Sequence, residues 1–521
     1  MLFNSFIFIF GFLPVALIAT YGIGRFSQWG AKLALTMLSL GFYAWWRPVH
    51  LPLLLGSIVF NFLVGDRIQR AQAAQRKTAV KAWLAFGLLV DIGMLGWFKY
   101  ANFITSTADA TLGTDFNLER IVLPLAISFF TFQKIAYLID SARGEAQRMS
   151  FLDFSLFAAF FPQLIAGPIV HYKEIVPQLA KAHFARLNWS DIGVGLVIFA
   201  IGLFKKTVIA DTLSPLVEPL FGAATSASNP SVIAGWLAAT TFTLQLYFDF
   251  SGYSDMAIGL GRMFGVKLPL NFHSPLRAAN ISDYWRRWHM TLQRFIVDYI
   301  FQPLAMPLNR FAAERGLSGW SQFLVGVAVP SFVTFVAVGI WHGAGWTFVT
   351  FGIMHASYIC INEAWRERRK NRRKTLRKQG IKLADPKGLE RAGYHVITLL
   401  AVVFGNVMFR AATVGDAVSI WATMAGFKGL NLASVVPGFD GELVAIITIA
   451  TLIIAFMPNT QQIMQRFDPA CNWSEWADVA PTRLRLTWAP TLAGLALAGV
   501  VLFIGVMFIQ RGQAVFLYFN F

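Results

Sequence analysis

Long apolar runs are the feature that most restricts how this chain can fold. A bilayer core about 30 Å thick is crossed by a helix of roughly 20 apolar residues, and many windows of the 521-residue sequence meet that length with few charges. Hydrophobic residues make up 56% of the chain, charged residues make up 14%, and the mean hydropathy is +0.55. We therefore predict an all-helical, polytopic integral membrane protein with roughly 11 to 13 spans plus re-entrant helices.

Basic residues cluster in short segments, and their placement predicts the topology. Between Arg366 and Arg391 the sequence has 12 Lys and Arg residues but only 3 acidic residues. Short basic loops stay on the cytoplasmic side of a membrane, so residues 362–392 are predicted to form a basic cytoplasmic loop that touches anionic membrane lipids. This clustering accounts for much of the formal net charge of +17, so we expect no nucleic acid partner.

Several familiar chemical motifs are missing from the sequence. The two cysteines, Cys360 and Cys471, have no CxxC neighbour, so we expect neither a disulfide framework nor a metal site. The sequence also lacks a GxSxG elbow, a P-loop, a dinucleotide fingerprint and an HExxH motif, so no bound cofactor is expected. The amino-terminal apolar run lacks the basic region of a secretory signal, and we interpret it as a retained first span.

Residues 151–170 form an apolar stretch that is interrupted rather than continuous. Pro162 and the pair Gly167-Pro168 break it, and basic residues flank it on both sides. Where a helix is broken inside a membrane, its free backbone groups need hydrogen-bond partners from the protein or from a water-filled cavity. We therefore predict a re-entrant element rather than a span.

Charged residues also follow apolar sequence further along the chain. Lys205 and Lys206 end an apolar run, and we expect their side chains to extend to the membrane interface. Asp249 and Asp255 lie in the apolar segment 247–265, where they are expected to line a polar path.

His289 lies in the segment ISDYWRRWHMTLQRFIVDYI, which begins at Ile281. If this segment is one continuous helix, Trp285, Trp288 and His289 fall on one face. One interpretation is a helix that presents His289 to a cavity, with Arg286 and Arg287 binding phosphate groups of a donor or of lipids. The alternative is an interfacial helix with aromatic and basic anchors.

His342 ends a long apolar run in the segment GIWHGAGW. Ionisable residues at bilayer depth usually line a protein cavity and take part in chemistry or transport. Gly339, Gly343 and Gly345 allow close backbone approach at this point, and a neutral imidazole can accept a proton from a hydroxyl as a general base. The alternative is a glycine packing seam with a structural histidine. His355 is interpreted as a residue that either supports the site from behind or only packs against it.

The order of several motifs resembles that of the membrane-bound O-acyltransferase family, especially its alginate O-acetylation and teichoic acid D-alanylation subgroup. The segments that carry the resemblance are PLAISFFTFQKIAYLIDSARGE (124–145), FFPQLIAGPIV (160–170), GLFKKTVIAD (202–211), YFDFSGYSDMAIGLGRMFG (247–265), NFHSPLRAANISDYWRRWHMTL (271–292), WHGAGWTFVTFGIMHA (341–356) and the final FLYFNF. Length and the carboxy-terminal extension are closer to the polysaccharide acetylation branch. One departure is IFQPLAMPLNR, where many relatives have a Pro-Leu-Gly-Gly turn.

The resemblance implies a single membrane domain over residues 1–521, with catalytic core motifs at 124–356 and a central funnel. By similarity, His342 takes the position of the essential histidine of the family, and His289 takes the second histidine position. The funnel is expected to be shaped or supported by four residues that match motif positions: Asp283, Trp285, Trp288 and Trp341. Arg286, which also matches, and Arg287 are the candidates for donor binding.

The implied reaction moves an acyl group from a cytoplasmic thioester, such as acetyl-CoA, for O-acetylation of an extracytoplasmic polysaccharide such as alginate. We expect a multi-pass protein of the bacterial inner membrane, with a separate extracytoplasmic SGNH-type acetyltransferase or esterase as partner. A D-alanyl donor on a carrier protein, with teichoic acid as acceptor, is the enzymatic alternative. A transporter with broken helices and a membrane scaffold are the non-enzymatic alternatives.

Overall fold

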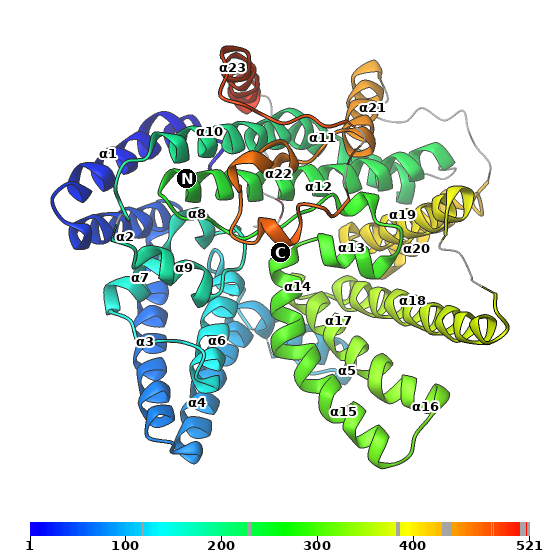
Figure 1. The fold of residues 1–521 in the computed structure, drawn as a ribbon. Helices are drawn as coiled ribbons and strands as arrows, with labels where there is room; N and C mark the ends of the chain where they lie inside the picture. Colours follow the sequence, from blue (N-terminus) through cyan, green and yellow to red (C-terminus); the bar gives the residue numbers. More distant parts are fainter. Residues whose placement is uncertain are drawn as a thin grey trace. The chain divides into compact units, whose positions relative to one another are not determined.

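The computed structural model describes residues 1–116, 118–182, 184–226, 231–381, 386–429, 440–480, 482, 484–510 and 517. Across these residues all regular structure is helical (Figure 1), which confirms the predicted fold class. The final FLYFNF motif lies outside the described residues except for Leu517. The chain divides into two compact units, which are described separately.

The first unit contains residues 1–211, 248–270 and 458–520. Its helices α3, α4 and α6 lie side by side, and α10 packs against α23 (Figure 1). The α-helices that lie wholly in this unit are α1 (Leu13–Gly24), α2 (Gln28–Ala44), α3 (Leu51–Ala73), α4 (Lys77–Leu95), α5 (Ala101–Leu112), α6 (Ile127–Arg143), α7 (Phe151–Ala159), α8 (Phe161–Leu164), α9 (Tyr172–Leu179), α10 (Trp189–Phe204), α22 (Thr460–Ile463) and α23 (Leu492–Met507).

The interrupted apolar stretch is indeed broken. α7 ends at Ala159, and the short helix α8 begins at Phe161, with Pro162 in its first turn. The carbonyl oxygen of Phe157 accepts hydrogen bonds from the side-chain amides of Gln133, at 3.0 Å, and Gln163, at 2.6 Å. Protein side chains thus satisfy backbone groups that the break releases, as a buried, broken segment requires.

The prediction for Lys205 and Lys206 is wrong. Lys206 is buried, and its ammonium group lies 2.6 Å from carboxylate oxygens of both Asp211 and Asp249. Lys205 lies 2.7 Å from Asp255. The chain folds each lysine back onto acidic residues because a buried charge needs an opposite charge more than a path to water. These ion pairs account for the positions of both lysines and of Asp249 and Asp255, and the polar path expected there stays a prediction.

The second unit contains residues 212–247 and 271–457. α11 (Asp211–Ser226) begins at its boundary, and α12 (Val232–Met263) runs from this unit into the first one. The remaining α-helices of the unit are α13 (Ile281–Arg287), α14 (Met290–Ile296), α15 (Gln302–Glu314), α16 (Gly319–Phe323), α17 (Val329–His342), α18 (Trp346–Lys378), α19 (Gly388–Arg410), α20 (Val414–Met424) and α21 (Gly441–Phe456).

α18 is the element around which the second unit is built. It packs against α17 on one side and α19 on another, and α13 contacts it as well. The segment predicted as a basic loop is largely part of this helix, because α18 continues to Lys378 and α19 begins at Gly388. Lys and Arg have good helix propensity, so the charge run extends the apolar helix instead of ending it.

Six helical stretches among the described residues are long and apolar enough to cross a membrane. They are Ile7–Gly24, Pro48–Ala73, Lys77–Leu112, Trp189–Thr225, Gly319–His342 and Gly388–Arg410. Two shorter apolar helices, α21 and α23, accompany them. The polytopic character is therefore confirmed, while the number of crossings stays a prediction.

Candidate functional site

His342 is the last residue of α17, and its side chain is buried. Glycines around His342 allow neighbouring residues to approach closely because they lack a side chain. A Cβ atom on Gly339 would collide with the carbonyl oxygen of Phe348, and one on Gly343 would collide with the Phe348 ring. Gly345, in contrast, has room for a Cβ. Two of the three glycines thus let α17 and α18 approach closely at the point where His342 emerges.

Aromatic rings surround the imidazole of His342. The ring centroids of Trp341, Phe409 and Phe351 lie 4.9, 5.2 and 6.1 Å from its own. All three rings meet it close to edge-on. The His342 ring is therefore packed between aromatic rings from α17, α18 and α19.

The continuous helix predicted around His289 is wrong. α13 ends at Arg287, and His289 has φ 44° and ψ 53°, in the left-handed region, before α14 begins at Met290. A non-glycine residue rarely adopts this conformation, and it persists only where surrounding contacts hold it. Trp285, Trp288 and His289 consequently do not share one helical face.

Asn271 provides the contacts that hold the break. Its backbone carbonyl accepts a hydrogen bond from the amide of Met290 at 2.9 Å. Its side-chain oxygen Oδ1 lies 2.9 Å from the hydroxyl of Thr291 and 3.0 Å from Nδ1 of His289. One residue therefore binds the three consecutive residues 289 to 291, and it fixes the His289 ring as well as its backbone.

These contacts also assign the tautomer of His289. Oδ1 of Asn271 accepts from the backbone amide of Thr291 at 3.4 Å, and an amide oxygen has no proton to donate. Nδ1 of His289 must therefore carry the hydrogen, which leaves the lone pair of the neutral ring on Nε2. His289 lies outside the six candidate spans, and burial lowers its pKa to about 3, so the ring is neutral near pH 7.

Trp341 connects the two histidines. Its ring centroid lies 5.9 Å from that of His289 and 4.9 Å from that of His342. The two imidazoles predicted from separate sequence segments thus come together around one indole. Both imidazoles are buried, and a neutral imidazole can accept a proton from a hydroxyl.

Asp283, Arg286 and Arg287 form an ion-pair cluster on α13. Asp283 lies 2.6 Å from Arg287 and 3.0 Å from Arg286. The Arg287 side chain is nearly buried, whereas that of Arg286 is more than half exposed. Both guanidinium groups pair with the single carboxylate of Asp283, which offsets one of their two positive charges and so reduces their capacity to bind phosphate. Their predicted role in donor binding stays a prediction.

Trp285 and Trp288 occupy different surroundings. The indole N–H of Trp285 donates to Nδ1 of His355 over 3.1 Å, so His355 has a specific polar contact beyond simple packing. Trp288 stacks on Tyr284, with ring centroids 5.7 Å apart, and meets Phe272 edge-on at 5.0 Å. Asp283 and Trp285 thus position their neighbours, and Trp288 packs beside the break at His289.

Sequence reasoning did not single out Asn271 or the hydrogen-bonding role of His355. Asn271 begins the quoted motif NFHSPLR, but it lies 18 residues before His289, and no periodic pattern connects residues across a helix break. In the described segments, no group of three or more His, Cys, Asp or Glu residues is arranged to hold a metal ion.

Comparison with known proteins finds a matching family model and several similar proteins. A model of the membrane-bound O-acyltransferase family matches residues 79–381, which include every residue of the site except Phe409. The peptidoglycan O-acetyltransferase of Helicobacter pylori is 38% identical over 460 residues, covering 83% of this chain and 81% of that protein. The probable alginate O-acetylase of Pseudomonas aeruginosa is 36% identical over 465 residues, covering 88% and 81%. The teichoic acid D-alanyltransferase of Bacillus subtilis is 29% identical over 258 residues, covering 48% and 62%.

Proposed function

Because the chain belongs to the membrane-bound O-acyltransferase family and is a multi-pass acyltransferase, we propose that it transfers an acetyl group from a cytoplasmic thioester to an acceptor hydroxyl. The donor in this proposal is acetyl-CoA. The transferred group serves the O-acetylation of an extracytoplasmic polysaccharide, and the protein acts in the bacterial inner membrane. The observation that carries the proposal is the pair of buried histidines that meet around Trp341.

The choice of acetyl over D-alanyl transfer rests on how far the relatives match. The two O-acetylating relatives match 83% and 88% of the chain at 38% and 36% identity. Two D-alanyl-transferring relatives match 55% and 48% of it at 28% and 29% identity. Similarity that extends over 83% and 88% of the chain supports an acetylating branch. Alginate and peptidoglycan are the acceptors named for these relatives, and we favour a polysaccharide of this kind.

His342 acts as the general base in the proposed mechanism. Its imidazole removes the proton of the acceptor hydroxyl while the oxygen attacks the thioester carbonyl. The carbon–sulfur bond then breaks, and the thiolate leaves with the proton that His342 has taken up. The position of His342 supports this role, because its buried ring lies beside Trp341, which also contacts His289.

The assigned tautomer of His289 limits the role that this residue can have in the mechanism. With Nδ1 donating to Asn271, its neutral ring offers a lone pair at Nε2 and no second N–H. Stabilising an oxyanion requires a donor, so that role would need a protonated ring. The assigned tautomer instead favours His289 as a hydrogen-bond acceptor that orients the acceptor hydroxyl or the donor. Asn271 is then a positioning residue.

Delivery to the polysaccharide requires a further protein in this proposal. The proposed reaction takes place within a membrane protein, so a polymer outside the membrane needs an extracytoplasmic enzyme to receive and place the acetyl group. We propose an SGNH-type acetyltransferase or esterase as that partner.

The test is label transfer from radiolabelled acetyl-CoA supplied to the cytoplasmic face of vesicles. Wild type is compared with His342→Gln, which keeps a polar side chain of similar size but has no basic nitrogen. His395→Ala is the matched control, because His395 lies on α19 and bonds the Ala278 carbonyl at 2.9 Å, away from the histidine pair. All three proteins are compared at equal amounts of folded protein.

We expect wild type and His395→Ala to deliver label to an outer-face acceptor, and His342→Gln to deliver at least 100-fold less, as for loss of a general base. Equal delivery by all three would refute the role of His342 and favour a scaffold or transporter. If wild type uses a D-alanyl carrier protein and not acetyl-CoA, the D-alanyl alternative replaces the acetyl proposal.

A further inference from the structure

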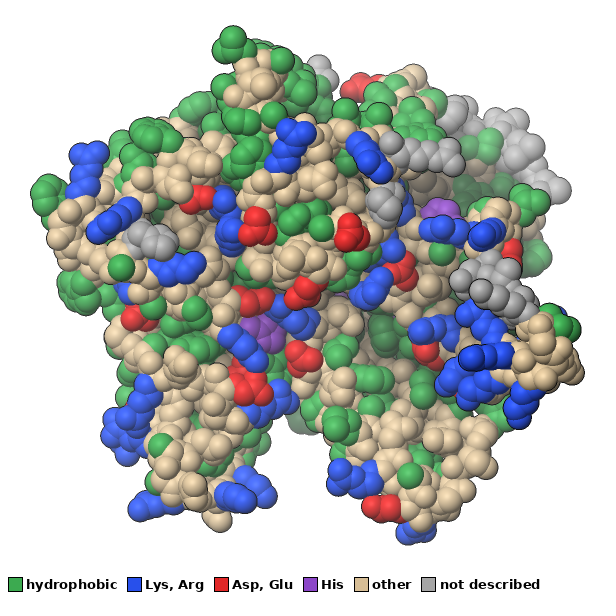
Figure 2. Space-filling model, viewed as in Figure 1, with side chains coloured by type: hydrophobic (Ala, Val, Ile, Leu, Met, Phe, Trp, Pro, Cys, Tyr) green, Lys and Arg blue, Asp and Glu red, His purple; other side chains and the backbone are tan. Residues whose placement is uncertain are grey.

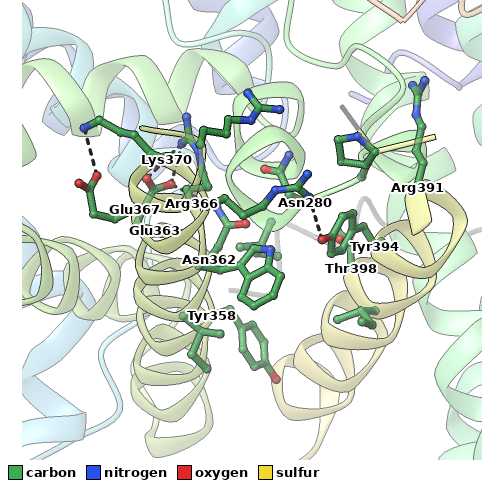
Figure 3. A pocket seen from close by; sticks show the side chains of 18 of the residues that line it. Asn280, Tyr358, Asn362, Glu363, Arg366, Glu367, Lys370, Arg391, Tyr394 and Thr398 are labelled. Atoms are coloured by element: carbon green, nitrogen blue, oxygen red, sulfur yellow. Dashed lines mark hydrogen bonds and ion pairs between the residues drawn. The ribbon is translucent and has the colours of Figure 1, made fainter. Parts of the chain in front are cut away.

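A large pocket lies between α18 and α19 in the second unit, separate from the histidine pair. Its volume is about 1950 Å³, and residues 279–281, just before and at the start of α13, also line it. Figure 3 shows Glu363, Arg366 and Lys370 on α18 on one side, with Tyr394 and Thr398 of α19 on the other. The proposed acyl transfer uses none of the residues that line this pocket, and the sequence predicted only that the basic segment 362–392 touches anionic lipids.

The charge of the pocket is strongly positive. Among the described residues, seven cationic side chains line it, together with only two carboxylates, Glu363 and Glu367. The cations are Arg366, Arg369, Lys370, Arg373, Lys374, Arg377 and Arg391. Figure 2 shows basic side chains gathered over the far end of α18. Such a concentration of like charge is unfavourable for the protein alone and favours an anionic occupant.

Local ion pairs balance only part of this charge. Arg366 lies 2.9 Å from Glu363, Lys370 lies 3.1 Å from Glu367, and Arg369 lies 2.8 Å from Glu390. Lys374, Arg377 and Arg391 have no ion-pair partner among the described residues. These three cations are therefore available for an anion, and they come from both helices that form the pocket.

The rest of the pocket wall is apolar and aromatic. Trp365, Tyr358, Ile361 and Ile397 line it, and Trp365 is 49% exposed. Arginine and aromatic rings together bind ligands that combine phosphate with a flat or apolar group, because guanidinium groups pair with phosphate while rings cover the remainder. A bare inorganic anion would leave this wall uncovered.

We propose that the pocket between α18 and α19 binds an organic phosphate through Lys374, Arg377 and Arg391, with its apolar or aromatic part against Trp365. Two sources supply this chemistry: a soluble nucleotide-like phosphate, such as the phosphorylated end of a thioester donor, and the headgroup of an anionic phospholipid. If the source is the donor, the inference rests on the proposed function, and it moves the phosphate contacts away from Arg286 and Arg287, which are both already paired with Asp283.

Direct binding tests the inference without catalysis. The full chain carrying His342→Gln is purified in an uncharged detergent, so that binding is measured whether or not acetyl transfer occurs. The pocket variant is Lys374→Ala with Arg377→Ala. The control is Arg372→Ala with Lys378→Ala, which removes the same two residue types from the same helix at positions that do not line the pocket.

Two probes distinguish the sources. One arm measures equilibrium binding of radiolabelled adenosine 3′,5′-bisphosphate, and the other measures retention of phosphatidylglycerol relative to phosphatidylcholine in mixed micelles. We expect the pocket variant to bind one probe roughly ten-fold more weakly than the control variant, with the difference shrinking at high salt.

Each outcome of the two binding measurements either supports one source of the phosphate or overturns the inference. Weaker bisphosphate binding by the pocket variant supports a soluble phosphate, and a lost preference for phosphatidylglycerol supports a lipid headgroup. If the pocket and control variants bind both probes equally, the inference is overturned. Because binding is measured in the His342→Gln background, its failure is distinguishable from failure of acetyl transfer in wild type.

Discussion

Replacing Asn271 tests the assigned tautomer of His289 more directly than replacing His289 itself. Oδ1 of Asn271 accepts hydrogen bonds from His289 and Thr291 at 3.0 and 2.9 Å. Asn271→Ala removes the acceptor while the donors stay buried. Each lost bond is worth about 1 to 1.5 kcal/mol, so the protein is expected to lose about 2 to 3 kcal/mol of stability. Without the acceptor, the tautomer of His289 with its hydrogen on Nδ1 loses about 1.4 kcal/mol relative to the other tautomer. This loss corresponds to roughly ten-fold lower activity.

Asn271→Asp separates hydrogen bonding from charge. A carboxylate at this position keeps the acceptor but also favours a protonated imidazole. A neighbouring opposite charge shifts a pKa by roughly 1 to 3 units, and the pKa of His289 starts at about 3 in the native protein. In the variant the ring therefore begins to protonate as the pH falls toward 5, whereas in wild type it stays neutral.

The assay is label transfer from acetyl-CoA in vesicles between pH 5 and 8. We expect the activity ratio of Asn271→Asp to wild type to fall as the pH is lowered from 8 to 5, because any titration of His342 is common to both proteins. Thr291→Val is the control, since it removes a different bond to the same oxygen, and its ratio to wild type should not change with pH. A flat ratio for Asn271→Asp, together with wild-type activity of Asn271→Ala, would refute the assignment.

Two further predictions concern stability, each measured by thermal unfolding in detergent. Lys206→Met leaves Asp211 and Asp249 buried without their cation, so we expect a loss of about 3 to 5 kcal/mol, and an unchanged midpoint would show that the ion pairs contribute little. Gly339→Ala places a methyl group against the Phe348 backbone and should cost about 1 to 3 kcal/mol. Gly393→Ala on α19, where a Cβ meets nothing within 4 Å, should be neutral or stabilising, so equal effects at both glycines would contradict close packing of α17 and α18.

The helical, membrane-spanning character of the protein was determined by local sequence. Apolar run length, few interrupting charges and the break near Pro162 each depend on neighbouring residues, and the structure has helices in these places. The histidines could also be singled out in this way, because an ionisable residue in an apolar run is conspicuous. The family resemblance rested on the order of motifs, which is likewise a property of the sequence alone.

The conformation of His289 and the partner of Lys206 depend on contacts between distant segments. The local sequence pattern gave wrong predictions for both. A helical repeat placed Trp285 and His289 on one face, but Asn271 holds His289 in a left-handed conformation that breaks the helix. The Lys206 side chain was expected to extend to the membrane interface. It instead forms an ion pair with Asp249, 43 positions further along the chain.

The sequence by itself determined which residues are costly to bury in a membrane protein, whereas the tertiary structure decided which partners satisfy them. Helix formation depends on residues three or four positions apart, so sequence patterns predict it well. The hydrogen bond from His289 to Asn271, the contact of Trp341 with both histidines and the basic pocket between α18 and α19 join separate segments. Their geometry exists only once the chain has folded and the helices have packed.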